Sequence, residues 1–167
     1  MEKTAYLSLG SNIGDRAANL HAAIEKLREL GTIVAVSALY ETEPVDFTAQ
    51  PWFLNCAVAL RTDVTPKLFL ARVQAIEQQM GRRRIQPKGP RNIDIDILLF
   101  GDSVMDTPEL QLPHPAMHER RFVLEPLAEI APDLRHPVLE KTVRELLQAL
   151  PRQDGQVKKA DPVSESE

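Results

Sequence analysis

The order of strand and helix patterns constrains the fold of this chain more than any other feature of its sequence. Residues 4–9 alternate apolar and polar side chains before Gly10-Ser11-Asn12, which is typical of a strand that runs into a turn. Apolar residues then recur at helical spacing over 20–30, after the N-cap candidate Asp15 and before Gly31, which stands where a helix end favours positive φ. Two strands, a helix and a strand follow, over 33–40, 53–61, 66–80 and 93–100. This β-α-β-β-α-β order predicts an α+β fold of the ferredoxin-like class, an antiparallel sheet with helices packed on one side.

The remaining segments complete a single domain. The stretch 41–52 holds two prolines and has no periodicity, and loops of about a dozen residues usually serve function in compact domains. Helical segments are predicted over 119–130 and 142–150. From Pro151 the sequence is polar and lacks apolar anchors, so we expect one domain over 1–150 and a disordered tail over 151–167.

Composition and charge narrow the class of protein. The chain has 167 residues, of which 43% are hydrophobic and 26% charged, and this suits one domain with its own core. A net charge of -4 gives no general attraction to nucleic acid or to an anionic membrane. The single cysteine, Cys56, excludes an internal disulfide framework, and no stretch resembles a targeting leader or a membrane span. We therefore expect a cytoplasmic monomer whose partners are small molecules.

Asp94 and Asp96 stand on the last predicted strand. There they share one face, about 7 Å apart, while Ile93, Ile95 and Ile97 share the other. Such carboxylates suit Mg²⁺, which takes a few protein oxygens and completes its shell with water and substrate phosphates. Aspartates that merely face water on an edge strand would alternate in the same way, so both interpretations stay open. Leu98 and Phe100 are expected to continue the aspartates' face, which favours an acidic pocket beside a core.

Cations gather directly before this strand, namely Arg82, Arg83, Arg84, Lys88 and Arg91. Guanidinium and ammonium groups suit phosphate oxygens. A charge run is more often a solvated surface, and that alternative also stays open. Because the acidic and basic clusters adjoin, we favour a site for a metal-bound polyphosphate. The glycine patterns of Walker loops and of dinucleotide-binding turns do not occur.

A few residues elsewhere are candidates for ligand contacts. His114 lies between two prolines and either donates to a phosphate oxygen or packs within a loop. Phe53 and Phe122 belong to the small aromatic content of the chain, and such rings are core residues more often than ligand platforms. Asn55 shares a strand face with Phe53, which pairs a stacking ring with an amide that donates and accepts.

Several short motifs occur together in one order along the chain. They are Leu9-Gly10-Ser11-Asn12, Tyr40-Glu41-Thr42-Glu43-Pro44, Phe53-Leu54-Asn55, Gly81-Arg82-Arg83-Arg84, Gly89-Pro90-Arg91-Asn92-Ile93-Asp94-Ile95-Asp96, Pro113-His114-Pro115 and Arg120-Arg121-Phe122. On these motifs the chain, over roughly residues 5–150, resembles the 6-hydroxymethyl-7,8-dihydropterin pyrophosphokinase family. Two positions depart from the pattern. Many relatives carry an aromatic residue where this chain has Lys88, and some carry a tyrosine where it has Pro115.

The resemblance implies transfer of the β,γ-diphosphate of ATP to the pterin hydroxymethyl group, with release of AMP, as a step of folate synthesis. It implies that Asp94 and Asp96 hold two Mg²⁺ ions and act in catalysis together with Arg82 and Arg91. The residues implied to contact the ATP phosphates are Arg82, Arg84, Arg91, His114 and Arg120. Those implied to bind the pterin are Phe53 and Phe122 on its faces and Asn55, Thr42, Pro44 and Val45 at its polar edge.

Two other functions remain open from the residues themselves. One is another metal-dependent phosphoryl enzyme, such as a nucleotidyltransferase or a phosphohydrolase, which would use the same aspartates and arginines. The other is a noncatalytic ferredoxin-like module that binds a small ligand and regulates a partner. Formation of AMP only in the presence of the pterin would separate the implied reaction from both.

Overall fold

The computed structural model describes residues 2–44, 49–81, 91–151 and 157–160. In chain order its elements are β1 (Lys3–Ser11), α1 (Arg16–Leu27), β2 (Thr32–Val36), β3 (Tyr40–Thr42), β4 (Phe53–Thr62), α2 (Pro66–Gln79), β5 (Asp94–Phe100), β6 (Met105–Asp106), β7 (Gln111–Leu112), the 3₁₀ turn η1 (Met117–Glu119), α3 (Arg121–Ile130), α4 (Val143–Gln148) and β8 (Val157–Lys159). Among the described residues, no helix combines the length and the apolar character that a membrane crossing needs.

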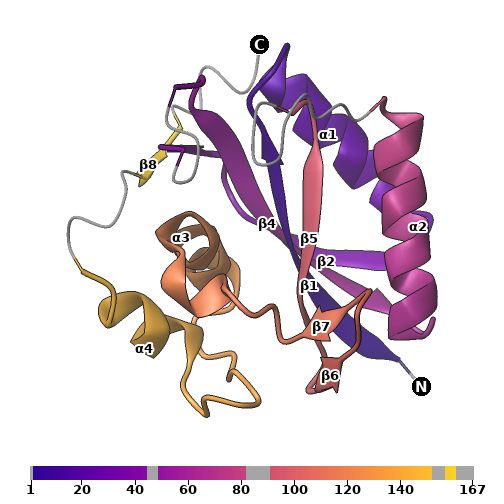
Figure 1. The fold of residues 1–167 in the computed structure, drawn as a ribbon, viewed down its shortest axis with the longest axis vertical. Helices are drawn as coiled ribbons and strands as arrows, with labels where there is room; N and C mark the ends of the chain where they lie inside the picture. The colour runs from indigo at the N-terminus through magenta and orange to yellow at the C-terminus, as the bar shows by residue number, and fades with distance from the viewer. Residues whose placement is uncertain (1, 45–48, 82–90, 152–156, 161–167) are drawn as a thin grey trace.

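The main sheet is antiparallel in every pairing, in the order β5-β1-β4-β3-β8, and β2 also pairs with β4 (Figure 1). The β-α-β-β-α-β order is confirmed, and β1 lies between β4 and β5. The strand predicted over 33–40 is instead two short strands, β2 and β3, that follow different halves of β4. They separate at Ser37, whose hydroxyl accepts the Ala57 N–H at 2.9 Å. A polar side chain that takes part in the backbone ladder ends the regular pairing of β2 there.

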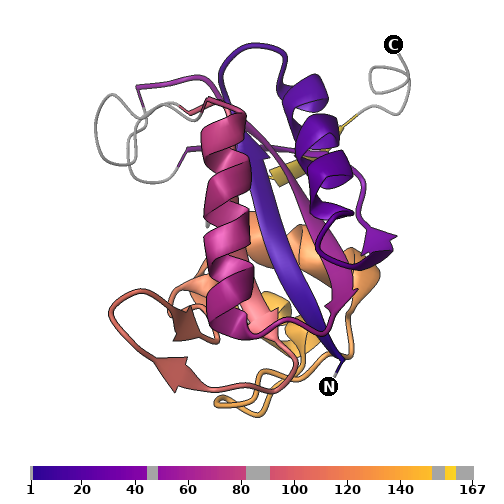
Figure 2. The same ribbon diagram turned by 90° about the vertical axis from the view of Figure 1, so that its right-hand side faces the viewer.

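Helices cover both faces of the sheet, so the expectation that they pack on one side is wrong. Figure 2 shows α1 and α2 side by side on one face, while α3 and α4 lie on the opposite side in Figure 1. The first face carries a core cluster that includes Leu7, Leu9 and Phe69. The second carries a separate cluster in which Leu124 and Leu127 of α3 pack with residues of β4 and β5. The final third of the chain supplies this second layer because its amphipathic segments need an apolar surface to bury.

Strand β5 changes the face of its side chains at a bulge. Tyr6 of β1 pairs with Leu99 and the next residue, Leu7, pairs with Ile97, which leaves Leu98 as an extra residue. Leu98 stays on the aspartates' face, in the cluster beneath α3, as predicted. Phe100 is on the other face, where its ring meets Phe69 of α2 edge to face at 5.5 Å, so the prediction for Phe100 is wrong.

The C-terminal segment contributes to the sheet. Val157–Lys159 forms β8 and pairs antiparallel with β3, and the Ala160 N–H donates to the Leu39 carbonyl at 2.7 Å. The disorder expected over 151–167 therefore does not hold for residues 157–160. Residues 152–156 and 161–167 lie outside the described residues.

Local signals for helix ends behave mostly as predicted. Asp15 is the N-cap of α1 and accepts the Ala18 N–H at 3.1 Å, and Thr65 caps α2 with Pro66 in the first turn. Gly31 is the exception, because positive φ occurs at other glycines of the described chain and not at this one. A Cβ at Gly31 would lie 2.0 Å from the Arg61 carbonyl oxygen, so glycine serves here to let two backbones approach.

The Gly31→Ala substitution tests this close approach. We expect it to lower the free energy of unfolding by about 3 kcal/mol or more, because the clashing atom belongs to backbone in β4 and cannot rotate away. The comparison is Gly81→Ala, where φ is +71° and nothing lies within 4 Å of the new methyl group. That change should cost only about 1–2 kcal/mol of backbone strain. Equal losses for the two variants in urea denaturation would contradict the explanation.

Candidate functional site

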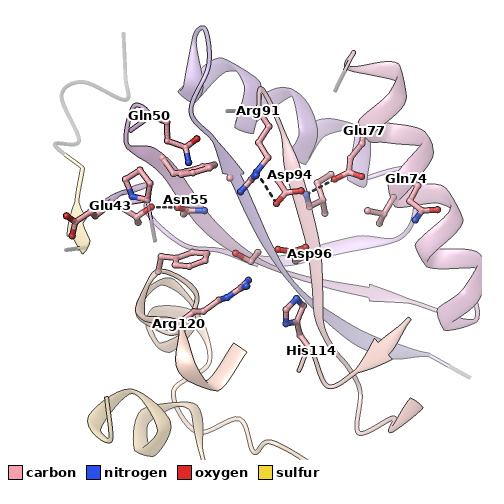
Figure 3. A pocket seen from close by; sticks show the side chains of 18 of the residues that line it. Glu43, Gln50, Asn55, Gln74, Glu77, Arg91, Asp94, Asp96, His114 and Arg120 are labelled. Atoms are coloured by element: carbon pink, nitrogen blue, oxygen red, sulfur yellow. Dashed lines mark hydrogen bonds and ion pairs between the residues drawn. The ribbon is translucent and has the colours of Figure 1, made fainter. Parts of the chain in front are cut away.

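A cavity of about 420 Å³ opens on the α3 side of the sheet, at the ends of β1, β4 and β5 (Figure 3). It is closed laterally by α2 and by the start of α3. The residues that line it are Ser8, Gly10, Thr42, Glu43, Pro44, Gln50, Phe53, Asn55, Leu70, Val73, Gln74, Glu77, Arg91, Asp94, Ile95, Asp96, His114, Arg120 and Phe122. Its size is within the range of small-molecule sites.

Gly10 forms the floor of this cavity. In β1, between β4 and β5, it pairs with Asn55 on one side and with Asp94 on the other. An added Cβ would lie 2.5 Å from the Asn55 Nδ2 atom and 3.5 Å from the Phe53 ring. Because Gly10 has no side chain, the space above it stays open, and the Asn55 amide and the Asp94 carboxylate border it from the two neighbouring strands.

Asp94 and Asp96 project from one face of β5 into the cavity, as the alternation predicts (Figure 3). Burial raises the pKa of Asp96 to about 7, and the negative charge of Asp94 adds to the effect. The charges of Arg120 and Arg91 act in the opposite direction. Two carboxylates in one partly dehydrated cavity repel each other, and a bound cation would relieve that repulsion.

The carboxylate pair fits a magnesium site that is completed by a substrate. No cluster of three or more His, Cys, Asp or Glu side chains within the described ranges is arranged to hold a metal. Mg²⁺ is commonly held by one or two carboxylates together with water and substrate phosphates. Asp94 and Asp96 are the residues that would hold it.

Glu77 of α2 fixes the position of the acidic strand. The residue is 9% exposed, and its Oε2 accepts the Ile95 N–H at 2.8 Å. Because β5 is at the edge of the sheet, this N–H points away from β1 and needs a partner outside the ladder. Glu77 thus satisfies the backbone between the two aspartates while its negative charge helps to raise the pKa of Asp96.

Arg91 joins the acidic end of the cavity to its aromatic end. Its Nε atom lies 3.6 Å from Oδ2 of Asp94, and its guanidinium carbon lies 4.9 Å from the centre of the Phe53 ring. The side chain is only 14% exposed, so these charges interact in a partly desolvated environment. Across the cavity, the guanidinium of Arg120 lies 5.6 Å from the Phe122 ring centre.

Asn55 is held in one orientation. Its Nδ2 donates to the Leu9 carbonyl at 3.2 Å, and its Oδ1 accepts a hydrogen bond from the Thr42 hydroxyl. An amide has two N–H groups and two lone pairs on oxygen, so one of each is used in these bonds. The remaining N–H group and the remaining lone pair are suited to the polar edge of a flat heteroaromatic ligand.

His114 offers the cavity a neutral hydrogen-bond donor. Its Nδ1 accepts the Ala116 N–H at 3.1 Å, so in the neutral ring the proton is on Nε2. Burial lowers the pKa of His114 to about 4, and the charge of Arg120 lowers it further. At neutral pH the imidazole therefore offers an uncharged N–H.

The structure brings most of the predicted site residues together in this one cavity. Those that line it are Thr42, Pro44, Phe53, Asn55, Arg91, Asp94, Asp96, His114, Arg120 and Phe122. The predicted residues Val45, Arg82 and Arg84 lie outside the described residues, as do Arg83 and Lys88 of the cation cluster.

Sequence reasoning did not assign the rest of the lining. On α2 the unassigned residues are Leu70, Val73 and Gln74, on β1 they are Ser8 and Gly10, and Glu43, Gln50 and Ile95 complete the set. For Glu77 the sequence allows two interpretations, a residue that orients the arginines or the pterin and a solvated helix face, and its exposure of 9% excludes the second. The α2 residues follow helical spacing and share one helix face, which is a usable signal once that face is known to meet the acidic strand. Ser8 and Gly10 are two residues apart on β1, and because side chains alternate along a strand they share one face of the sheet.

Comparison with known proteins gives a consistent family. A family model described as 7,8-dihydro-6-hydroxymethylpterin-pyrophosphokinase (HPPK) matches residues 6–132. A 2-amino-4-hydroxy-6-hydroxymethyldihydropteridine pyrophosphokinase of Methylorubrum extorquens is 50% identical over 148 residues, which are 87% of this chain and 92% of the relative. The enzyme of that name from Bacillus subtilis is 47% identical over 132 residues, covering 78% and 79% of the two chains. The folic acid synthesis protein fol1 of Schizosaccharomyces pombe is 44% identical over 90% of this chain, which spans only 21% of fol1.

Solved structures agree in fold. The HPPK-DHPS of Plasmodium falciparum with pterin and p-hydroxybenzoate superimposes with a TM-score of 0.72 at 20% identity. The match covers 89% of this chain and 42% of that one. At this identity the likeness concerns the fold alone.

The raised pKa of Asp96 predicts a pH-dependent stability. Its ordinary pKa is 3.8 and the folded value is about 7, so the ligand-free folded state loses stability as the pH rises between these values, and the loss is complete above pH 7. Asp96→Asn removes the ionisation, and its stabilising effect should be greater at pH 8 than at pH 5 by on the order of 2 kcal/mol. Thermal or urea unfolding without metal or ligand at the two pH values measures this difference.

The exposed Asp102, in the turn after β5, provides the control Asp102→Asn. A gain for Asp96→Asn that is equal at both pH values would refute the assignment.

Proposed function

The chain belongs to the 7,8-dihydro-6-hydroxymethylpterin-pyrophosphokinase family, and from that premise we propose that it transfers the β,γ-diphosphate of ATP to 6-hydroxymethyl-7,8-dihydropterin. The products are AMP and the pterin diphosphate, and the reaction is a step of folate biosynthesis. The observation that supports this most strongly is that one cavity combines a carboxylate pair, two arginines and a neutral histidine with two phenylalanines and a fixed amide.

The acidic end suits a metal-bound triphosphate. Asp94 and Asp96 would hold two Mg²⁺ ions, and the buried repulsion that raises the pKa of Asp96 supports a cation at this place. Mg²⁺ held there would supply positive charge that offsets the negative charge developing on the transferred group. Glu77 holds the strand that carries both aspartates, so the two carboxylates are oriented before any ligand arrives.

The cations and His114 suit the phosphate oxygens. Arg91 and Arg120 supply positive charge from opposite sides of the cavity, and the Nε2–H of His114 supplies a donor without adding a charge. The proposal keeps Arg82 and Arg84 as further phosphate contacts and Arg82 and Arg91 as catalytic residues. Positioning and charge stabilisation account for most of the catalysis of phosphoryl transfer, which is the work these groups are suited to do.

The other end suits a flat pterin. Phe53 and Phe122 would stack on its faces, while Asn55 and Thr42 would meet its donors and acceptors. Pro44 lines the same end, and the proposal includes the backbone of Val45. An apolar slot with a polar rim discriminates a pterin from rings that lack its hydrogen-bonding edge, because the fixed amide would then lose its partners.

The proposed enzyme acts as a monomer in the cytoplasm on small-molecule substrates, without a nucleic-acid or membrane partner. The net charge of -4 supports the absence of a polyanionic partner.

Product analysis tests the reaction directly. The purified protein is mixed with ATP, Mg²⁺ and 6-hydroxymethyl-7,8-dihydropterin, and the nucleotides and pterins are separated by chromatography. We expect equal amounts of AMP and pterin diphosphate, and no AMP when the pterin or the metal is omitted. Asp96→Ala should lower the rate by at least about a hundredfold, because it removes half of the carboxylate pair. ADP as product, or nucleotide breakdown without pterin, would instead indicate another phosphoryl enzyme, and binding without turnover would indicate a regulatory module.

Gly10→Ala tests the floor of the pterin end. The new methyl group would displace the Asn55 side chain, whose Nδ2 atom lies 2.5 Å from the added Cβ. The KM for the pterin should rise at least about tenfold, with a stability loss of only about 1–2 kcal/mol because the side chain can rotate away. In an Asn55→Ala background the same substitution should have little further effect on the KM for the pterin. A full additional loss in that background would show that the methyl group acts by another route.

A further inference from the structure

Asn12 lies directly after β1, is 2% exposed and is not among the residues that line the cavity. Its side-chain Oδ1 accepts the Arg91 backbone N–H at 2.8 Å, and its own backbone N–H donates to the Arg91 carbonyl at 3.0 Å. Its Nδ2 donates to Gln50 Oε1 at 2.8 Å and to the Pro51 carbonyl at 3.0 Å. One residue thus binds two segments that are distant in sequence.

Both segments carry groups of the site. Arg91 reaches both the carboxylate of Asp94 and the ring of Phe53. Gln50 lines the cavity, and Pro51 comes two residues before Phe53 at the start of β4. Asn12 therefore ties the backbone of the arginine to the segment that leads into the ring on which that arginine stacks.

Asparagine is well suited to this position. The contacts require one acceptor and two donor hydrogens on a short side chain, and the amide of asparagine provides them. Aspartate would keep the acceptor for the Arg91 N–H and lose both donors. Alanine would leave the partly buried Arg91 backbone N–H without this partner, which costs stability.

We propose that Asn12 is a positioning residue of the active site, which acts through the guanidinium group of Arg91. It holds the Arg91 backbone so that the guanidinium stays between the Asp94 carboxylate and the Phe53 ring, where phosphate and pterin meet. This role rests on the proposed diphosphate transfer for its substrates. It extends that function by assigning a task to a residue that touches neither substrate.

The test compares Asn12→Ala with a matched control. Asn19 lies in the first turn of α1, and its Nδ2 donates to Ser11 Oγ at 3.2 Å and to the Ile13 carbonyl at 3.0 Å, so neither bond involves Arg91 or Gln50. Binding of Mg²⁺ with α,β-methylene-ATP, and then of the dihydropterin, is measured by calorimetry, and Tm is measured in parallel. Asn12→Ala should weaken binding by about tenfold or more, while Asn19→Ala should leave it within about threefold whatever its effect on Tm.

A double-mutant cycle with Arg91→Ala separates positioning from simple stabilisation. The bonds from Asn12 to Arg91 involve the Arg91 backbone and not its side chain, so they persist in Arg91→Ala. Asn12→Ala should therefore lose most of its effect on binding in that background, to within about threefold. An undiminished effect there, or a lower Tm with normal binding and kcat/KM, would overturn the proposal.

Two further readouts complete the design. If Asn12→Ala does not fold, Asn12→Asp is used; it keeps the acceptor bond to Arg91 and should weaken binding less than tenfold but measurably, and unchanged binding would count against the role. If the wild-type protein binds both ligands but forms no pterin diphosphate, the proposed reaction fails. The binding cycle still decides the role of Asn12 in that case.

Discussion

Strand β1 is hydrogen-bonded on both edges, to β4 and to β5, and this double pairing sets Asn55, Asp94 and Asp96 relative to one another. Gly10 is opposite Asn55 on one side and Asp94 on the other, and Ser8 is opposite Asp96. Side chains alternate along each strand, so a slip of one residue would turn the carboxylates or the amide to the opposite face. The helices, the second core cluster and the aromatic end of the cavity are all arranged around this register.

The site has an electrostatic cost that the surrounding structure limits. Two carboxylates share a partly buried volume, and Glu77 adds a third negative charge while it satisfies the backbone of β5. Arg91 and Arg120 offset part of this repulsion, and each also packs against an aromatic ring. The ligand-free protein therefore retains an unrelieved preference for cations, which is a common arrangement where binding sites are preorganised at the expense of stability.

Local patterns in the sequence predicted the strands, the helices and the acidic face, because periodicity and capping act within a few residues. The alternation at Asp94 and Asp96 needs no tertiary information to be recognised. The change of face at Phe100 does, since it depends on a bulge at Leu98 and on the ring of Phe69. The covering of the second face depends on a cluster assembled from β4, β5 and α3, and the pairing of β8 depends on an open edge at β3. The bond from Glu77 to the Ile95 N–H could not be predicted, because this partner is a backbone group of another element. The family motifs were recognisable and Asn12 stands in one of them, but its bonds to Arg91 and Gln50 show only in three dimensions.

The pairing of β1 with β5 also has a kinetic side. Gly10 and Asp94 lie more than eighty residues apart in the sequence, whereas a helix turn or a hairpin closes over a few residues. Bringing distant segments together costs loop-closure entropy before their contacts stabilise the chain, and chains rich in such contacts fold slowly. A partly folded form can therefore hold its helices and much of its apolar surface together and still lack a ligand site. Ligands that bind only the completed sheet would then stabilise the folded state, because their binding shifts the equilibrium toward the form in which β5 is paired.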